Sequence, residues 1–568
     1  MADNYKADNI HPWDPRSLNH IIEDAIKSNW ERMALSDLGG ISFKFSEVAE
    51  NVEKLHILFE AAGIRPGDKV AICGKNSAVW AVVFIACLTS GTVAVPILHE
   101  FKPENIHTLV NHSEAKLLFV DAAIWKKLNP DELPGLVGAF FLSEKGMPLS
   151  RSKRLTCVND EINEEFGKKF PKDFTPADLN YYHDTPEELC VINYTSGSTG
   201  ASKGVMLPFR SLWSNIRYCI DHLTFLKPGD GIVNMLPLGH LYGMVIEMLH
   251  PFVKGCHCNF ITKAPSPHVL LSAFAEVRPK LIITVPLVLE KIIKGNVFPK
   301  IQTPMMTFLL KIPFVNTKIY EKIRQQLINV FGGQVRELII GGAPLNAEVE
   351  SFLYKIKFPI TVGYGMTECG PLLTYAPPQK SKPHTVGEIM DRMEVRIDSP
   401  DPQRIPGNIW VKGDNVMQGY YKNPEATKEV MPNDDGWMNT GDMGTIDSDG
   451  IIAINGRSKT MILGPSGQNI YPEEIEQAIN NMPYVNESLV IDDHGKLVAL
   501  IHPDFDAAQK AGISKEELEK IMDENLKKVN AKLESYNRLN RYKIMEKEFE
   551  KTPKRSIKRY LYSNKYVS

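Results

Sequence analysis

The sequence predicts an α/β protein whose parallel sheets are covered by helices on both faces, followed by a smaller α+β domain. Short apolar runs alternate with helical patterns over most of the chain, and several of these runs end abruptly in glycine-rich or small polar residues. Such alternation is typical of parallel sheets, whose ligands bind at the carboxyl ends of the strands. Beyond about residue 456 the pattern changes to two amphipathic helices with short strands between them.

Three of the apolar runs are predicted to be strands that lead into glycine-rich turns. Residues 189–194 run into TSGSTG, residues 337–340 into GGAPL and residues 360–362 into GYGMTE. Helical patterns occupy residues 266–277 and 347–356. The glycine-rich turns therefore mark the predicted binding site.

The longest apolar stretch, residues 80–97, approaches the length of a membrane span. Hydroxyl residues, Gly91 and Pro96 interrupt it. We therefore expect a buried helix, a Ser-Gly turn and a core strand in place of a membrane span.

The C-terminal part is predicted to be a compact α+β unit of about 110 residues. One helix is expected to begin at Pro472, and a second begins with the capping box Ser514–Glu517. The strand candidates between these helices are residues 488–491 and 496–502.

Composition narrows the function and the compartment. Lysine and arginine number 65 and aspartate and glutamate 68 in 568 residues, so the net charge of −3 gives no global attraction to nucleic acid or to an anionic bilayer. The eight cysteines are scattered, unlike the disulfide framework of a small secreted domain. The first fifteen residues, MADNYKADNIHPWDP, lack the apolar core of a signal peptide. We expect a cytoplasmic protein, and peripheral membrane contact stays open.

The segment YTSGSTGASKGVM, residues 194–206, has the composition of a phosphate-binding loop. Its glycines allow close backbone approach, its hydroxyls offer donors and Lys203 supplies a cation. It is not a Walker loop, because Ser202 stands where that motif requires glycine. By composition alone, the alternative is an ordinary Ser/Gly surface loop.

The order of residues in this loop resembles the signature of the adenylate-forming superfamily, which includes acyl-CoA synthetases, adenylation domains of peptide synthetases and beetle luciferases. The resemblance continues collinearly over nearly the whole chain, through GGAPL, GYGMTE, NTGD, GRSKTMI and GQNIYPEEIE. Within the superfamily, the chain looks most like a bacterial long-chain fatty acyl-CoA ligase.

The resemblance implies a fold and a reaction. The expected fold has a large N-terminal domain of parallel-sheet layers plus a distorted barrel, residues 1–458, and a small mobile C-terminal domain, residues 459–568, with a hinge at Lys459. A carboxylate would attack the α-phosphate of ATP, giving an acyl-adenylate and pyrophosphate, and a thiolate would then attack the mixed anhydride. Both steps develop charge on oxygens, which fixed donors, a lysine and Mg²⁺ would stabilise.

The resemblance also implies the site residues. The residues expected to cradle the phosphates are Thr195, Ser196, Gly197, Ser198, Thr199, Gly200 and Lys203. Thr195 and Glu368 would hold Mg²⁺, and Thr367 would reach the α-phosphate. The nucleoside would be bound by Gly342, Ala343, Pro344, Tyr364, Gly365, Asp442 and Arg457, the last two at the ribose. The catalytic residues would be Lys203, His240, Thr367, Glu368, Lys459 and Lys558.

Three of these residues carry further expectations. His240 would lie between the carboxylate site and the thiol channel, although a lone histidine is more often a packed core residue. Gly365 stands where members restricted to acetate carry tryptophan, so a longer or bulkier acid is implied. Lys459 would let the small domain swing and admit the pantetheine arm; the alternative is an ordinary surface lysine.

The sequence departs from the family near its end. The family usually has a lysine in a G-K-I-x-R pattern, and aligning Ile557 and Arg559 of KTPKRSIKRYLY places Ser556 there. Lys554 or Lys558 must substitute, or adenylation is slow. The lysines and arginines of this C-terminal segment could alternatively form a nucleic-acid-binding patch, but the net charge of the protein argues against that interpretation. The run Cys256-His257-Cys258 matches no usual zinc framework, and ordinary packing is expected.

The leading hypothesis is therefore a ligase that activates a medium- or long-chain fatty acid with ATP and Mg²⁺ and transfers it to coenzyme A. One alternative is an aryl-CoA ligase or the loading of a separate acyl carrier protein. An alternative of another class is a nucleotide- or acyl-binding regulator that turns over weakly because of Ser556. The shared loops also leave luciferase-like light emission open, and the sequence leaves open whether the chain forms a homodimer.

Overall fold

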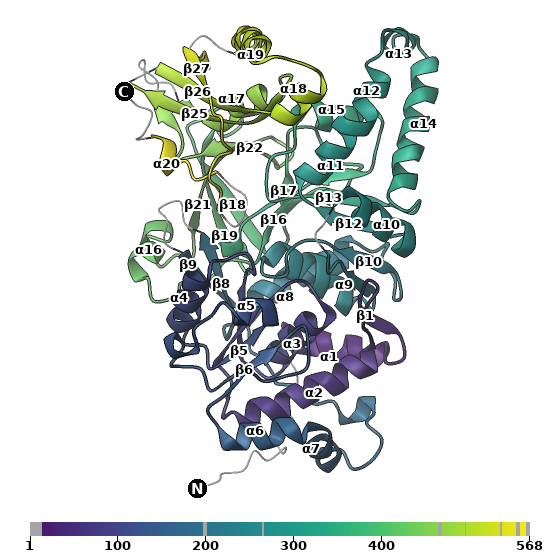
Figure 1. Ribbon diagram of the computed structural model, residues 1–568, viewed down its shortest axis with the longest axis vertical. Coiled ribbons are helices and arrows are strands. Elements are labelled where there is room, and N and C mark those ends of the chain that lie inside the picture. The colour runs from purple at the N-terminus through teal and green to yellow at the C-terminus, as the bar shows by residue number, and fades with distance from the viewer. Residues whose placement is uncertain are drawn as a thin grey trace.

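The computed structural model describes residues 14–196, 202–263, 266–463, 469–494, 496–533, 537–552 and 557–563. Figure 1 shows an elongated molecule in which the N-terminal helices lie at one end and the C-terminal sheet at the other. Three sheets with helices around them form the larger part, and a seven-stranded antiparallel sheet connects them to the C-terminal unit. The large N-terminal region and smaller C-terminal unit of the predicted α/β fold are confirmed.

The largest sheet has eight strands in the order β20-β9-β8-β4-β3-β5-β6-β7. Strands β8, β4, β3, β5 and β6 run parallel to one another. At the edges, β9 pairs antiparallel with β8, β20 antiparallel with β9, and β7 antiparallel with β6. The strands are β3 Lys69–Cys73, β4 Val93–Ile97, β5 Leu117–Val120, β6 Gly138–Phe141, β7 Leu149–Ser150, β8 Leu189–Ser196, β9 Ser202–Pro208 and β20 Gly419–Tyr420.

Two smaller sheets continue the parallel arrangement. One has the order β10-β11-β1-β2 and the other β12-β13-β14, and all of their pairs are parallel except β1 with β2. The strands are β1 Met33–Asp37, β2 Ser42–Lys44, β10 Gly231–Asn234, β11 His257–Phe260, β12 Leu281–Thr284, β13 Glu337–Ile340 and β14 Ile360–Val362. The strands predicted at 337–340 and 360–362 are confirmed as β13 and β14.

Helices cover these sheets and alternate with their strands along the chain (Figure 1). They are α1 Leu18–Ser28, α2 Phe45–Ala61, α3 Ala78–Thr89, α4 Pro103–Ser113, α5 Ala122–Trp125, α6 Lys153–Asp160, α7 Ile162–Lys169, α8 Phe209–His222, the π-helix η3 Tyr242–Leu249, α9 His250–Val253, α10 Pro267–Val277, α11 Pro286–Ile292, α12 Phe298–Ile301, α13 Pro304–Leu309, α14 Val315–Val330 and α15 Ala347–Lys355.

The apolar stretch at residues 80–97 forms most of α3 and the whole of β4. Every residue of α3 except Val79 is buried, and Ser77 caps its first turn by accepting from the Trp80 amide. The expectation of a helix, a turn and a core strand is confirmed. In the part of the chain that the structure describes, no helix is long and apolar enough to cross a bilayer.

The antiparallel sheet has the order β15-β16-β17-β22-β21-β19-β18. It lies in the part of the chain for which a distorted barrel was expected. Its strands are β15 Tyr364–Gly365, β16 Leu372–Tyr375, β17 Gly387–Ile389, β18 Met393–Asp398, β19 Gly407–Gly413, β21 Met438–Ile446 and β22 Ile451–Arg457, and the short helix α16 Pro424–Val430 precedes β21. This sheet matters for function because β15, β21 and β22 each carry a predicted site residue.

The C-terminal unit is a three-stranded sheet covered by helices. β26 (Lys496–Pro503) lies between antiparallel β25 (Val485–Asp493) and parallel β27 (Arg541–Ile544). The helices are α17 Pro472–Asn480, α18 Phe505–Lys510, α19 Lys515–Asn530 and α20 Tyr560–Ser563. The capping box at α19 is confirmed, because Ser514 Oγ accepts from the Glu517 amide and Glu517 Oε2 accepts from the Ser514 amide.

Candidate functional site

The described ends of the predicted phosphate loop, Thr195, Ser196 and Lys203, lie on two paired strands. β8 pairs antiparallel with β9, so Thr195 stands opposite Lys203 and Ser196 opposite Ser202. The Thr195 hydroxyl is 3.5 Å from the Lys203 carbonyl oxygen. Sequence analysis foresaw the first strand but not the second, since a loop between two strands has the same local glycine signature as a strand–helix turn. Gly197, Ser198, Thr199 and Gly200 lie outside the described residues.

Tyr420 connects the hairpin to the predicted metal ligand. Its strand β20 pairs with β9, which places the Tyr420 ring 4.8 Å from the Lys203 ammonium. The Tyr420 hydroxyl donates a 2.8 Å hydrogen bond to Glu368 Oε1. Burial and the neighbouring carboxylate raise the pKa of Tyr420, so the phenol stays protonated and remains a donor. Sequence analysis missed Tyr420, because a two-residue strand leaves no periodic pattern.

Glu368 is held in place from two sides. It lies with Thr367 in the 3₁₀ turn η5 (Thr367–Cys369), directly after β15. Its carbonyl oxygen accepts from the Met417 amide at 2.9 Å, and the next carbonyl, of Cys369, accepts from Asn215 Nδ2 of α8 at 3.1 Å. The turn therefore joins the antiparallel sheet to the helix that follows the hairpin.

The donor set near the hairpin fits Mg²⁺. A threonine hydroxyl at Thr195 and a carboxylate at Glu368 are hard oxygen ligands of the kind that Mg²⁺ prefers. No group of three or more His, Cys, Asp or Glu gathers around a common point among the described residues. Mg²⁺ with few protein ligands is typically completed by water and substrate phosphates.

Tyr364, Asp442 and Arg457 form a second cluster. Asp442 of β21 is paired in register with Arg457 of β22, whose Nε lies 3.3 Å from Asp442 Oδ1. Tyr364 of β15 donates a 2.6 Å hydrogen bond to Asp442 Oδ2. Burial raises the pKa of Asp442, while Arg457 and Tyr364 act in the opposite direction. The carboxylate is thus oriented at both oxygens and buried, as a diol-binding group requires.

Only three residues of chain separate the two clusters. Tyr364 belongs to the Asp442 cluster and Glu368 to the Lys203 cluster, and the segment between them is β15 followed by η5. Side-chain contacts and this short segment therefore connect Lys203, one of the predicted phosphate ligands, to the predicted ribose ligands.

Gly342, Ala343 and Pro344 form an exposed turn between β13 and α15. Gly342 has a φ of +84°, a conformation that glycine adopts without strain. Beneath this turn, the Tyr242 ring packs so closely on Gly341 that a Cβ atom there would lie 3.1 Å from it. The turn can present an open backbone surface to a flat ligand.

Gly365 has a structural reason to be glycine. A Cβ atom at this position would lie 2.1 Å from the Pro371 carbonyl oxygen, a contact that backbone atoms cannot relieve without moving. The absence of a side chain at Gly365 is therefore explained by local packing as well as by the expected size of the acid.

His240 lies in the turn between β10 and η3 and is half-buried. Its amide donates to the Pro237 carbonyl at 3.0 Å. Asn193 of β8 donates from Nδ2 to the carbonyl of Gly239 at 3.0 Å, which fixes the turn against the strand that carries Thr195. A π-helix such as η3 is frequent at functional sites.

Lys459 follows β22 and contacts α16. Its ammonium lies 2.7 Å from Glu429 Oε1, and both side chains are exposed. The pKa of Glu429 is lowered by Lys459 and, more weakly, by Lys203. The lysine predicted at the hinge and the lysine of the hairpin thus lie near the same carboxylate. Glu429 was not identified from the sequence, where it is one acidic residue among many on a short helix.

The described contacts of Lys558 lie within the C-terminal unit, where its ammonium is 3.6 Å from Glu550 Oε2 and its amide donates to the Glu550 carbonyl. The structure brings it into none of the clusters above. Lys554 and Ser556 lie outside the described residues. Lys551 and Arg559 pair with carboxylates of their own unit.

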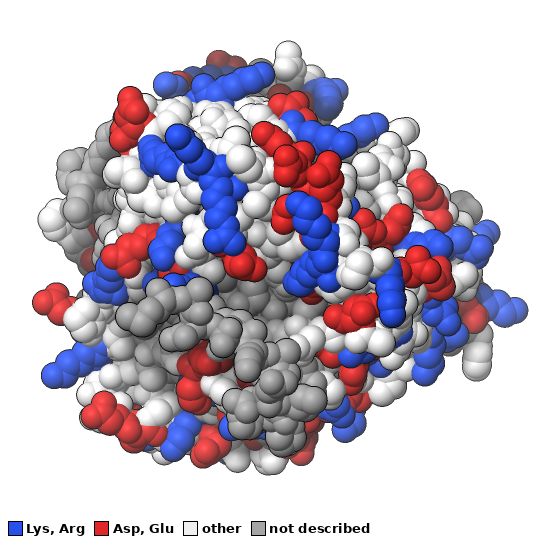
Figure 2. Space-filling model, turned by 90° about the horizontal axis from the view of Figure 1, so that it is seen from below, with Lys and Arg blue, Asp and Glu red and all other residues white. Residues whose placement is uncertain are grey.

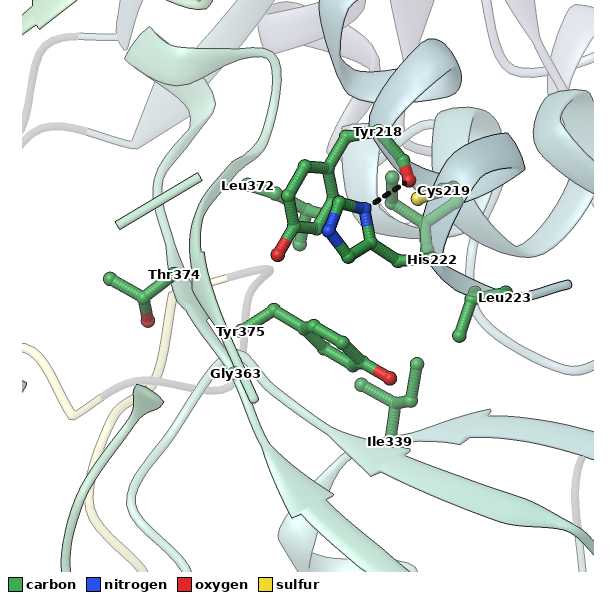
Figure 3. Close-up of a pocket in the computed structure, with 10 residues that line it drawn as sticks. Tyr218, Cys219, His222, Leu223, Ile339, Gly363, Leu372, Thr374 and Tyr375 are labelled. Atoms are coloured by element: carbon green, nitrogen blue, oxygen red, sulfur yellow. Dashed lines mark hydrogen bonds between the residues drawn. The ribbon is translucent and has the colours of Figure 1, made fainter. Parts of the chain in front are cut away.

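A cavity opens beside Gly363, the residue before Tyr364 (Figure 3). Its walls come from α8, β13, β16 and η3 and are mostly apolar. They are formed by Tyr218, Cys219, His222, Leu223, Ile246, Ile339, Gly363, Leu372, Thr374 and Tyr375. The Tyr218 ring stacks on His222 with centroids 3.9 Å apart, and Tyr375 meets both rings edge-on. These rings occupy much of the space in Figure 3.

Comparison with family models, other protein sequences and solved structures shows which proteins this chain resembles. A family model described as AMP-binding enzyme matches residues 22–421, and a second, described as AMP-binding enzyme C-terminal domain, matches residues 459–568. The chain is 27% identical to a long-chain-fatty-acid–CoA ligase of Mycobacterium bovis, over 92% of this chain and 90% of that protein. It is 29% identical to a feruloyl-CoA synthase of an Amycolatopsis species, over 80% of this chain and 81% of that protein. The crystal structure of ATP-bound MatB from Rhodopseudomonas palustris has a similar fold, with a TM-score of 0.75 and 22% identity over 97% of this chain and 99% of that one.

Proposed function

Because the chain belongs to the family of AMP-binding enzymes, we propose that it activates a medium- or long-chain fatty acid with ATP and transfers the acyl group to coenzyme A. In the first step, a carboxylate oxygen bonds to the α-phosphorus of ATP and the bond to pyrophosphate breaks. In the second, the coenzyme A thiolate bonds to the acyl carbon and AMP leaves, which gives the thioester.

The observation that carries this proposal is the series of contacts from Lys203 through Tyr420 and Glu368, and along residues 364–368, to Asp442. A nucleoside triphosphate needs cationic and hydroxyl groups at one end and a diol acceptor at the other. The contacts from Lys203 to Tyr420 to Glu368, and from Tyr364 to Asp442 to Arg457, supply both, with three residues of chain between Tyr364 and Glu368.

At the phosphate end, Lys203 would balance the charge that develops on the α-phosphate oxygens. Thr195 and Glu368 would hold Mg²⁺, which when bound supplies positive charge to the phosphates. The Tyr420 hydrogen bond keeps one Glu368 oxygen at a fixed orientation. Thr367, one residue before Glu368, would donate to the α-phosphate.

At the nucleoside end, Asp442 would accept both ribose hydroxyls while Arg457 braces the same sugar. Gly342, Ala343 and Pro344 would line one face of the adenine and Tyr364 the other. This assignment is supported by the exposed turn after β13 and by the buried, oriented carboxylate of Asp442.

For the second step, we propose that residues 459–568 swing as a unit about Lys459. The ion pair of Lys459 with Glu429 is present in the domain arrangement described here. It would break when the C-terminal unit turns into the arrangement proposed for thioester formation. His240 would lie on the path of the thiol. Lys558 is proposed as the substitute for the usual C-terminal lysine, which requires it to leave Glu550 during adenylation.

The acyl group is proposed to enter at the cavity beside Gly363, whose free volume of about 20 Å³ requires the surrounding rings to move aside for a longer chain. Its apolar walls suit a hydrocarbon chain, and each buried methylene contributes roughly 0.8 kcal/mol. Similarity to a long-chain-fatty-acid–CoA ligase supports this substrate class.

An aryl acid is the second candidate, and a specific observation favours it. The three rings of Tyr218, His222 and Tyr375 could stack on or meet an aromatic substrate edge-on. The similarity to a feruloyl-CoA synthase points in the same direction.

A panel of acids tests the proposal. The purified enzyme is assayed for AMP and thioester formation with straight-chain acids from acetate to stearate and with benzoate and ferulate, using coenzyme A or a phosphopantetheinylated carrier protein as acceptor. The proposal expects the highest kcat/KM for a medium or long chain with coenzyme A. A preference for acetate, for an aryl acid or for the carrier protein would contradict it.

A further inference from the structure

A helical excursion projects from the edge of the molecule between β12 and β13. It consists of α11, the π-turn η4 (Ile293–Val297), α12, α13 and α14, and Figure 1 shows α13 at its tip, with α14 running back towards the body. Its base is attached: Phe298 packs edge-on against Phe352 of α15, and Tyr320 receives the Lys355 ammonium on its ring. Its tip is different, because α13 contains no buried residue and α14 buries only Leu327.

The tip carries the most exposed large apolar side chains among the described residues. Phe314 is 85% exposed, Met305 74% and Phe308 66%, whereas the next most exposed large apolar residue, Ile405, reaches 47%. Met305 and Phe308 are three residues apart and so share one face of α13. Phe314 lies at the start of α14, after a short turn. Apolar groups gathered at one exposed place indicate an interaction surface.

Between Glu290 and Glu321, the chain of the excursion carries charge of one sign. Residues 291–320 contain five lysines, Lys291, Lys294, Lys300, Lys311 and Lys318, and no aspartate or glutamate. Within the described part of the chain, no ion pair joins these lysines to a carboxylate. On the face shown in Figure 2, by contrast, acidic and basic side chains are interspersed. The overall charge of −3 therefore conceals a local cationic segment.

We propose that this tip, defined by Met305, Phe308 and Phe314, docks onto the surface of an anionic lipid bilayer together with the lysines of the excursion. Exposed aromatic and apolar side chains beside lysines suit the boundary between head groups and acyl chains, where the lysine stems reach towards the lipid phosphates. A projecting tip with charge of a single sign favours a broad anionic surface over a folded partner, which would offer a groove. The proposal goes beyond the proposed ligase activity and does not rest on it.

The experiment measures binding of the full-length protein to sedimented vesicles. One set of vesicles is phosphatidylcholine alone and the other contains one third phosphatidylglycerol. The wild type is expected to bind the anionic vesicles at least tenfold more strongly, and this preference should fall as salt is raised. Two triple variants should each lower the partition coefficient at least tenfold: Met305→Ser/Phe308→Ser/Phe314→Ser and Lys300→Gln/Lys311→Gln/Lys318→Gln.

Matched controls change exposed residues elsewhere: Ile41→Ser/Ile405→Ser/Phe505→Ser and Lys127→Gln/Lys153→Gln/Lys520→Gln. Both should bind vesicles like the wild type, and thermal melting checks that all four variants fold. The proposal is overturned if the wild type fails to bind, if the tip variants bind normally, or if the controls lose binding equally. Light scattering supplies a further contrary outcome: a wild-type dimer that becomes a monomer on Met305→Ser/Phe308→Ser/Phe314→Ser, without vesicle binding, would assign the tip to a second copy of the chain.

Discussion

Tyr420 donates a 2.8 Å hydrogen bond to the carboxylate of Glu368. The same ring lies 4.8 Å from the ammonium of Lys203, so one side chain touches both the predicted metal ligand and the predicted phosphate cation. This relationship gives Tyr420 a positioning role that neither the loop motif nor composition reveals.

Tyr420→Phe should lower the affinity for Mg²⁺ and so raise the Mg²⁺ concentration that adenylation requires. The variant keeps the ring beside Lys203 but frees Glu368 from its donor, and loss of a hydrogen bond to a charged group costs about 1.5–3 kcal/mol, roughly ten- to a hundredfold in affinity. The measurement is the Mg²⁺ concentration that gives half-maximal adenylation. Tyr421→Phe is the matched control, because the Tyr421 hydroxyl donates to exposed Glu114. An unchanged Mg²⁺ requirement in Tyr420→Phe would remove the positioning role.

Asp442→Asn should lower the affinity for ATP about tenfold or more and leave folding intact. Asparagine keeps the shape but loses the negative charge that pairs with Arg457 and accepts from Tyr364. Because burial raises the pKa of Asp442, nucleotide affinity of the wild type should begin to fall at a higher pH than for an exposed aspartate as the solution is acidified. Calorimetric titration with ATP across pH checks both effects, and wild-type affinity in Asp442→Asn would refute the ribose assignment.

Much of this architecture follows from the sequence, and the reasons for the exceptions are physical. Strands β13 and β14 match their predicted limits because four- and three-residue apolar runs bounded by glycine or proline have few alternatives. The capping box at Ser514 was predictable because it is a local interaction. The contacts of Tyr420 and Glu429 were not, since each depends on a residue far away in the chain, Glu368 and Lys459 respectively. The close approach of Gly365 to the Pro371 carbonyl depends on how the intervening turn folds, which no local pattern fixes.

Lys459→Glu should slow thioester formation more than adenylation. The substitution replaces the ion pair with Glu429 by repulsion, at the residue about which the C-terminal unit is proposed to turn before thioester formation. Single-turnover assays that start from the acyl-adenylate separate the two steps. Lys428→Glu, on an exposed position of α16, is the control. Wild-type rates for both half-reactions in Lys459→Glu would remove the hinge assignment.

The cavity beside Gly363 predicts opposite effects of two substitutions at Leu372, which is half-buried in its wall. Leu372→Ala should extend the preferred chain, and Leu372→Trp should shorten it, because they enlarge and fill the same space. The measurement is kcat/KM along the straight-chain series, with melting temperature as the check on folding. If both variants keep the wild-type profile, the acyl chain binds elsewhere.

Glu337 should make stability depend on pH. Burial raises its pKa to about 7, and its Oε1 accepts from the Tyr375 hydroxyl at 2.8 Å. The folded state holds this proton more tightly than the unfolded state does. The free energy of unfolding should therefore fall by roughly 3 kcal/mol as the pH rises from about 4.5 to about 7, and then level off. Glu337→Gln should lose this decline in melting temperature, whereas exposed Glu276→Gln should retain it. An identical pH profile in Glu337→Gln would contradict the assignment.

The central claim is that the hairpin carrying Lys203 holds ATP so that an organic acid can be joined to AMP. Exchange of labelled pyrophosphate into ATP, in the presence of a long-chain fatty acid and Mg²⁺, reports that step alone. We expect the wild type to show exchange that requires the acid, and we expect the rate of exchange to fall at least a hundredfold in Lys203→Ala. Binding of ATP without acid-dependent exchange in the wild type would contradict it and would favour a nucleotide-binding regulator.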